Sequence, residues 1–257
     1  MRHAIAATLA IAGLVAAAPA RAEQLITTLT NHRVLITSNY TGVELVLFGA
    51  IEHEAADPLR HGPYDIVATI TAPREALRTR RKSRVLGIWV NTAARTFVDP
   101  PSYLAVLASA PLDVITNADN RRRLQLGIAG TPLPELINND IGEVSNDPFR
   151  AALVQLMEKR GLYSEKPNAV TFLTPTLFRA SIELPAQVPI GDYDVDVKLF
   201  TEGAMIAQTN SGFEIEKFGF EQFVVESARD HGLLYGVVTA MMALLTGWIA
   251  SVAFRRD

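Results

Sequence analysis

An uninterrupted apolar stretch near the end of the chain constrains the fold more than any other feature of the sequence. Leu233–Phe254 holds 22 residues without a charged side chain. As a helix it would be about 33 Å long, against a bilayer hydrocarbon core of about 30 Å. Because lipid offers the backbone no hydrogen-bond partners, a helix is the only structure that a lone span can adopt. The sequence therefore predicts one transmembrane helix here, rather than a buried helix of a soluble protein.

The charged residues beside this stretch predict its orientation. Arg255 and Arg256 follow it directly, whereas Arg229 and Asp230 before it cancel in charge. Because positive flanking charge prefers the cytoplasmic side, the chain before the span is expected on the other side, in the periplasm.

The start of the chain has the composition of an export signal. Arg2 and His3 precede an apolar run from Ala4 to Ala18, and Ala20-Arg21-Ala22 follows shortly after. A cationic start, a short apolar run and an Ala-x-Ala site are typical of a secretory signal peptide, which we expect to be removed. The rival interpretation is an uncleaved anchor, but the run is short for a span. We predict a single-pass protein of the bacterial inner membrane with a periplasmic N-terminal domain and a cytoplasmic C-terminus.

Composition argues against several classes of function. The chain has no cysteine, which excludes disulfides, thiol nucleophiles and cysteine-ligated metal centres. Its formal net charge is −3, so we expect no binding to nucleic acid. The sequence shows no nucleophile elbow, phosphate-binding loop or dinucleotide fingerprint. We therefore predict neither an enzyme nor a bound cofactor.

Most of the chain between the two ends is predicted as β-strand. Val43–Ile51 and Val85–Val90 are almost continuously apolar, as in strands that are covered on both faces or lie centrally. Leu177–Leu184 and Asp192–Phe200 alternate between apolar and polar residues, which is typical of antiparallel strands with one wet face. The predicted fold class is mainly β, an immunoglobulin-like antiparallel β-sandwich ectodomain with a short helical insertion and one C-terminal transmembrane helix.

The helical insertion interrupts the strands, and its firmest helix runs from about residue 148 to residue 160. Asp147 can cap this helix, Pro148 suits its first turn and Gly161 suits its end. An apolar stripe at helical spacing would pack on a sheet, and its members are Phe149, Leu153, Leu156 and Met157. A shorter helix is expected over residues 119–126, with the arginines at 121–123 facing outward.

The predicted division of the chain has seven parts. They are a cleaved signal peptide (1–22), a β-rich region (23–116), the helical insertion (117–163), an antiparallel β region (164–217), a juxtamembrane segment (218–232), the transmembrane helix (233–254) and a cytoplasmic tail (255–257). The juxtamembrane segment is predicted either as a helix at the membrane surface or as a plain stalk.

Short sequences spread along the chain carry a family resemblance. They are Arg80–Asn91, Pro101–Tyr103, Phe149-Arg150 with Gly161–Tyr163, Gly191–Val195, Phe218–Glu221, Asp230-His231, Leu234–Gly236 and Gly247-Trp248. With these residues the chain resembles an alphaproteobacterial family of transmembrane proteins over its whole mature length. The resemblance implies a neighbouring sulfite-exporter-type permease, and hence an accessory role in transport. It brings no catalytic residues with it.

A basic run is the sharpest local candidate for a site, and it comprises Arg78, Arg80, Arg81, Lys82 and Arg84. Arginine forks match oxyanions, so the run could hold an anion. It could equally meet phospholipid head groups or an acidic partner. The plainest alternative is the solvated end of a hairpin that leads into a central strand.

Two groups of potential metal ligands do not fit a metal site. Asp192, Asp194 and Asp196 have the spacing of a calcium loop's start, but Val197 stands where such a loop needs glycine. Strand alternation explains these aspartates as a solvent face. A second group, in a predicted loop, follows no recognised ligand spacing, and it comprises His53, Glu54, Asp57 and His61. We predict no metal.

Small residues recur along one face of the predicted span, at Gly236, Ala240, Ala243, Gly247 and Ser251. Such a stripe lets a second helix approach closely, although small residues are also common in membrane helices generally. Besides the lipid bilayer, the expected partners are a polytopic transporter or a second copy of this chain.

Three functions are compatible with these features. The first is a non-enzymatic accessory or interaction subunit of an inner-membrane system, which we predict. The second is a periplasmic anion-binding module linked to sulfur-oxyanion transport, and the third is a periplasmic enzyme whose site is assembled from distant residues.

The predicted topology can be tested with reporters fused after Asp257. A reporter that works only in the cytoplasm should be active when it is fused after Asp257, because Arg255 and Arg256 keep this end of the chain in the cytoplasm. Alkaline phosphatase, which works only in the periplasm, should be inactive at the same point. Phosphatase activity after Asp257, or recovery of the chain in the soluble fraction, would contradict the topology.

Overall fold

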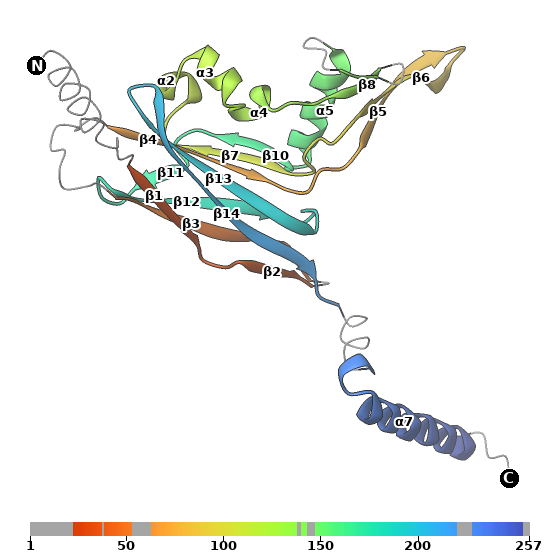
Figure 1. The fold of residues 1–257 in the computed structure, drawn as a ribbon. Helices are drawn as coiled ribbons and strands as arrows, with labels where there is room; N and C mark the ends of the chain where they lie inside the picture. Colours follow the sequence, from red (N-terminus) through yellow and green to blue (C-terminus); the bar gives the residue numbers. More distant parts are fainter. Residues whose placement is uncertain are drawn as a thin grey trace, which may run out of the picture.

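A computed structural model describes residues 23–37, 39–52, 63–137, 140–142, 147–219 and 228–253 of the chain. The predicted signal peptide and the group His53, Glu54, Asp57 and His61 lie outside these residues. The described chain is mainly β, as predicted, and ends in one long apolar helix (Figure 1).

Two sheets form the body of the protein. The four-stranded sheet has the order β1 (Gln24–Leu29), β3 (Gly42–Glu52), β12 (Leu177–Pro185) and β11 (Val170–Phe172), with antiparallel neighbours throughout. The six-stranded sheet has the order β10 (Tyr163–Lys166), β7 (Leu104–Ala108), β4 (Tyr64–Thr71), β13 (Gly191–Thr201), β14 (Ala204–Lys217) and β2 (Arg33–Ile36). Its two edge pairs, β10–β7 and β14–β2, are parallel, and its inner pairs are antiparallel.

The remaining elements lie outside this body. A third sheet has the order β5 (Leu77–Val85), β6 (Ile88–Phe97), β8 (Glu135–Ile137) and β9 (Asp140–Gly142). The helices are α2 (Leu112–Ile115), α3 (Ala118–Arg123), α4 (Gly127–Gly130), α5 (Pro148–Lys159) and α7 (Gly232–Ala253). The segment predicted as a helical insertion thus also contains the β8–β9 hairpin.

The alternating residues of the strands build the core between the two sheets. In β12 the buried residues are Phe178, Ala180, Ile182 and Leu184, and in β13 they include Tyr193, Val195, Val197 and Leu199. They belong to one continuous cluster of buried apolar side chains. Because period-two burial requires one covered face, this pattern confirms the predicted sandwich.

The six-stranded sheet is also covered on its second face. Val67 and Ala68 are consecutive in β4 and both fully buried, and every residue of β7 is buried. Figure 1 shows α2, α3 and α4 on the side of this sheet away from β3 and β12. Leu112 and Ile115 of α2 are buried there, so the sheet lies between the four-stranded sheet and a helical layer.

Helix α5 forms as its sequence predicts. The Asp147 side chain accepts a hydrogen bond from the backbone N–H of Phe149 at 2.8 Å, which caps the first turn. Gly161 follows the helix with a φ of +70°, a conformation that glycine adopts without strain. Phe149, Leu153 and Met157 are buried, whereas Leu156 is 50% exposed.

The prediction of a central strand at Val85–Val90 is wrong. These residues form the tip of the long β5–β6 hairpin, with a two-residue turn at Leu86 and Gly87. Both turn residues have positive φ, +49° and +85°. The side chains of the tip are exposed rather than buried. An apolar run shows that burial would be favourable, but it does not show that any other element covers it.

Helix α7 is long and apolar enough to cross a membrane. It begins one residue before the predicted start, at Gly232, and is described to Ala253. No residue of Gly232–Ser251 is buried by the described part of the chain.

The close packing of the sandwich at Gly49 gives a stability test. Gly49 in β3 lies opposite Phe178 in β12, and a β-carbon at Gly49 would overlap the Phe178 ring. We expect Gly49→Ala to destabilise the ectodomain by roughly 1–3 kcal/mol, because the core must shift. Urea unfolding of the detergent-solubilised chain, followed by circular dichroism, measures the change. Gly219→Ala is the control, since its β-carbon meets nothing within 4 Å. Equal midpoints for the two variants would contradict the packing.

Candidate functional site

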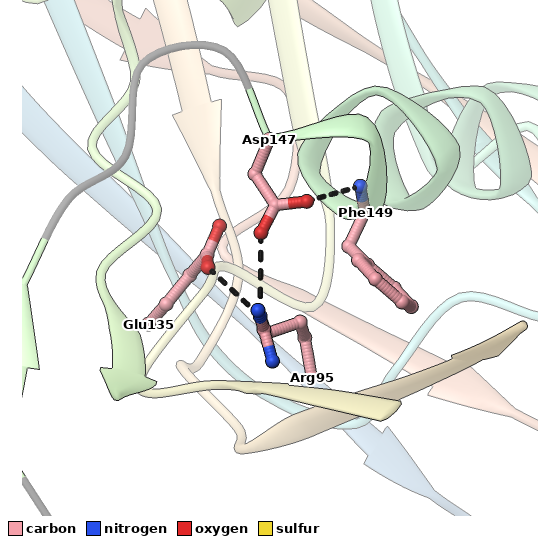
Figure 2. Close-up of polar contacts among 4 residues, drawn as sticks. All are labelled: Arg95, Glu135, Asp147 and Phe149. Carbon is pink, nitrogen blue, oxygen red and sulfur yellow. Dashed lines mark hydrogen bonds and ion pairs between the residues drawn. The ribbon is translucent and has the colours of Figure 1, made fainter. Parts of the chain in front are cut away.

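A cluster of ionisable groups joins the third sheet to α5, and Figure 2 shows its residues. Arg95 comes from β6, Glu135 from β8, and Asp147 precedes α5. The Arg95 Nε lies 3.3 Å from Asp147 Oδ2 and 3.9 Å from Glu135 Oε2. We call these three residues the Glu135 cluster.

Pairing within the third sheet and the cap of α5 assemble this cluster. β6 and β8 pair at Phe97 and Glu135, which puts Glu135 close to Arg95. Asp147 is fixed from the other side, because its second carboxylate oxygen caps α5. The cluster therefore ties β6 to the start of α5, and Arg95 and Asp147 are 52 residues apart in the chain.

Glu135 has an unusual environment for a carboxylate. Its side chain is 1% exposed, and neither of its carboxylate oxygens accepts a hydrogen bond from the described residues. Burial raises the pKa of Glu135, and the neighbouring Asp147 raises it further. Arg95 and Arg150 oppose this rise. Two carboxyl groups beside one arginine can therefore hold a proton above the usual range of a glutamic acid.

An aromatic ring connects the cluster to the basic run. The guanidinium carbons of Arg81 and Arg95 lie 5.4 and 5.5 Å from the centre of the Phe149 ring, within the range of cation–π contacts. Arg81 thus differs from its neighbours in the run, because it packs against α5.

The rest of the basic run does not converge on one point. Arg78, Arg80, Lys82 and Arg84 are exposed and alternate along β5. At about 3.3 Å per residue, Arg78 and Arg84 are roughly 20 Å apart along the strand. The described structure therefore places them as a row on a hairpin, and not as a cradle around a single oxyanion.

Two hollows lie beside α4 and α5. The larger, with a volume of about 1090 Å³, is lined by residues that include Ile128, Asp147, Arg150, Val154, Glu158 and Glu165. The smaller, of about 300 Å³, has Arg121, Arg122 and Glu165 in its wall. Several of these charged groups already bind the backbone. Arg150 Nη2 donates to the Thr131 carbonyl at 2.8 Å, and Glu165 Oε2 accepts from the Ile128 N–H at 3.0 Å.

The aspartates with calcium-like spacing lie on β13, in the strand that alternation predicted, but only two of the three are on an exposed face. Asp192 and Asp194 are exposed on β13, whereas Asp196 is partly buried, forms an ion pair with Lys198 and accepts a hydrogen bond from Gln208 at 2.8 Å. No group of three or more His, Cys, Asp or Glu residues suited to a metal occurs in the described residues.

Two of the family-like motifs meet at the end of the six-stranded sheet. Tyr163 donates its hydroxyl to the Pro101 carbonyl at 2.7 Å, and Tyr103 donates to the Glu183 carbonyl at 2.8 Å. Burial raises the pKa of both phenols. These tyrosines satisfy buried backbone carbonyls, and hence the motifs Pro101–Tyr103 and Gly161–Tyr163 have a role in the fold.

No sequence pattern indicates the Glu135 cluster as a site. Asp147 was identifiable as a cap, but Arg95 and Glu135 belong to no motif and lie far apart in the chain. Only the pairing of β6 with β8 brings them together, and no local pattern encodes that pairing.

Comparison with known proteins gives one family. A family model described as "Putative transmembrane protein (Alph_Pro_TM)" matches residues 24–256, which is nearly the whole chain after the predicted signal peptide. No curated protein matches the chain.

The raised pKa of Glu135 predicts a dependence of stability on pH. The folded chain holds this proton more tightly than the unfolded chain does, so stability falls as pH rises from the ordinary value of 4.5 through the raised value. Glu135→Gln should remove this contribution. Its urea midpoint should rise relative to the parent chain as pH increases from about 4.5 to 8. Glu158→Gln, on the exposed face of α5, is the control for charge. A constant difference between Glu135→Gln and the parent across this range would contradict the prediction.

Proposed function

We propose that this chain, which belongs to the family of alphaproteobacterial transmembrane proteins, is a membrane-anchored accessory or interaction subunit of an inner-membrane system. The observation that carries the proposal is the exposure of the apolar helix α7. It is apolar enough to span a membrane, and the described part of the chain buries no residue of Gly232–Ser251. The span therefore offers its whole surface to lipid and to other membrane helices.

The distribution of small residues over that surface supports a helix partner. Gly236, Ala240, Ala243, Gly247 and Ser251 share one face of α7. A β-carbon added at Gly236 or Gly247 would meet nothing within 4 Å. The fold of the chain itself thus does not require glycine at these positions, whereas close approach of a second helix would.

We place the sandwich in the periplasm and the end of the chain in the cytoplasm. Support comes from the export-type residues 1–22 and from the charge of Arg255 and Arg256. In this arrangement the sandwich is a periplasmic domain held beside whatever membrane protein α7 contacts.

A structural role, rather than a catalytic one, fits the Glu135 cluster best. Arg95 contacts both carboxylates of the Glu135 cluster and also packs against Phe149. Asp147 is occupied in capping α5. Each of these groups therefore already has a structural contact, and we assign the cluster to joining the third sheet to α5.

The proposal can be tested by crosslinking from α7, because the chain has no cysteine of its own. A cysteine at Ala243 lies on the small-residue face, and a cysteine at Leu245 lies on the opposite face. Each carries a maleimide photocrosslinker in native membranes. We expect a defined crosslinked product from Ala243→Cys and none from Leu245→Cys.

Adding Gly236→Leu and Gly247→Leu to the Ala243→Cys chain should abolish the product, because the added side chains separate the helices. Val238→Leu, on the other face, is the matched control and should leave the product intact. Crosslinking to lipid alone from both faces would contradict the proposal. Mass spectrometry of the product decides between a second copy and a polytopic transporter.

A further inference from the structure

The tip of the β5–β6 hairpin exposes apolar side chains in a way that nothing in the described structure explains. Leu86 is 98% exposed, and Ile88 and Trp89 are each 67% exposed. Val85 and Val90 beside them are also exposed. A contiguous exposed apolar patch generally marks a contact surface, because water around it is unfavourable.

The hairpin combines this tip with a row of cations. Arg80, Lys82 and Arg84 alternate along β5, so they lie on one face of the hairpin. Arg84 pairs across the strands with Trp89, which adds an indole ring to the same face at the tip. Cations just behind apolar side chains and a tryptophan are the pattern of segments that lie in a membrane interface.

Topology places this hairpin at the end of the sandwich from which the chain leaves for α7. The pairing of β4, β7 and β13 puts Thr71, Leu104 and Asp194 at one end of the six-stranded sheet. The hairpin is inserted between Thr71 and Leu104, and the last strand, β14, ends at the same end with Lys217. Figure 1 shows the hairpin projecting beyond the sandwich.

The length of the segment that joins the sandwich to α7 and the length of the hairpin are compatible with contact between the tip and the membrane. Residues 218–231 join the sandwich to α7, and a chain of that length reaches at most roughly 45 Å. Strand β5 has nine residues and is about 30 Å long. A hairpin of this length can reach the bilayer surface as long as the connection spans less than about two thirds of its full reach.

We propose that the β5–β6 hairpin inserts its tip into the interface of a bilayer that contains anionic phospholipid. Leu86, Ile88 and Trp89 enter the boundary between head groups and acyl chains, while Arg80, Lys82 and Arg84 pair with lipid phosphates. A lipid surface suits this tip better than a protein groove, because the side chains project from both faces of a narrow two-residue turn. The hairpin is then a second membrane contact, which holds the sandwich at a fixed tilt.

The chain has two tryptophans, Trp89 at the hairpin tip and Trp248 in α7. Removing the second makes a direct fluorescence test of the tip possible. Trp248→Phe leaves Trp89 as the single tryptophan of the chain, so that emission excited selectively from tryptophan reports on the hairpin tip. This variant is reconstituted into vesicles of phosphatidylethanolamine and phosphatidylglycerol with and without brominated acyl chains. We expect a blue-shifted Trp89 emission that brominated lipid quenches. In vesicles of phosphatidylcholine alone the quenching should be smaller.

Two variants separate the contributions to this signal. Replacing Arg80, Lys82 and Arg84 with glutamine should reduce the quenching in anionic vesicles to the level seen with phosphatidylcholine. A reporter at the opposite end of the sandwich, Met205→Trp in a chain with Trp89→Phe and Trp248→Phe, should not be quenched. That position follows the turn between β13 and β14.

Each remaining outcome overturns the proposal. A blue-shifted emission that brominated lipid does not quench would show that protein covers the tip, either a partner or a second copy. A red emission that aqueous iodide quenches would show that the tip stays in water. Equal quenching with and without anionic lipid would remove the role of the cations. None of these results depends on the helix contact proposed for α7, so the two proposals fail separately.

Discussion

Coverage of the six-stranded sheet on both faces is the constraint on which the rest of the structure depends. A buried aliphatic side chain contributes about 1.5–3 kcal/mol, and consecutive buried residues such as Val67 and Ala68 need a layer on each side. The four-stranded sheet provides one layer, and α2–α4 provide the other (Figure 1). Lys198 is buried in this sheet, and its ammonium group forms an ion pair with Asp196.

Sequence patterns predicted those parts of the fold in which neighbouring residues of the chain determine the structure. In β12, and in β13 as far as Val197, every second residue faces the core, so alternation in the sequence equals alternation in burial. From Val197 to Phe200 of β13 consecutive residues are buried, so the single wet face predicted for Asp192–Phe200 is wrong there, because the sheet is covered on both faces. The cap and end of α5 were equally readable from Asp147 and Gly161. The prediction for Val85–Val90 was wrong, because apolar residues in a strand predict that another element buries them. No described element of the chain buries this run.

The Glu135 cluster could not be predicted for a different reason. Its three side chains come from β6, β8 and the start of α5. They meet only because β6 pairs with β8 outside the sandwich and Asp147 lies beside Arg95. Neither periodicity nor spacing carries that information. The raised pKa of Glu135 is a consequence of the same assembly, since burial and the proximity of Asp147 arise only in the folded chain.

The two apolar surfaces that the chain leaves uncovered belong together physically. The sandwich buries its own apolar strands almost completely, so an inability to form a core does not explain the exposure of α7 or of the hairpin tip. Both surfaces follow from one end of the six-stranded sheet, and both carry the residue types that favour lipid over water. Under the proposal for the hairpin, the lipid that accepts α7 also accepts Leu86 and Trp89. One bilayer then accounts for both surfaces, and the partner helix proposed for α7 needs to contact only the small-residue face of the span.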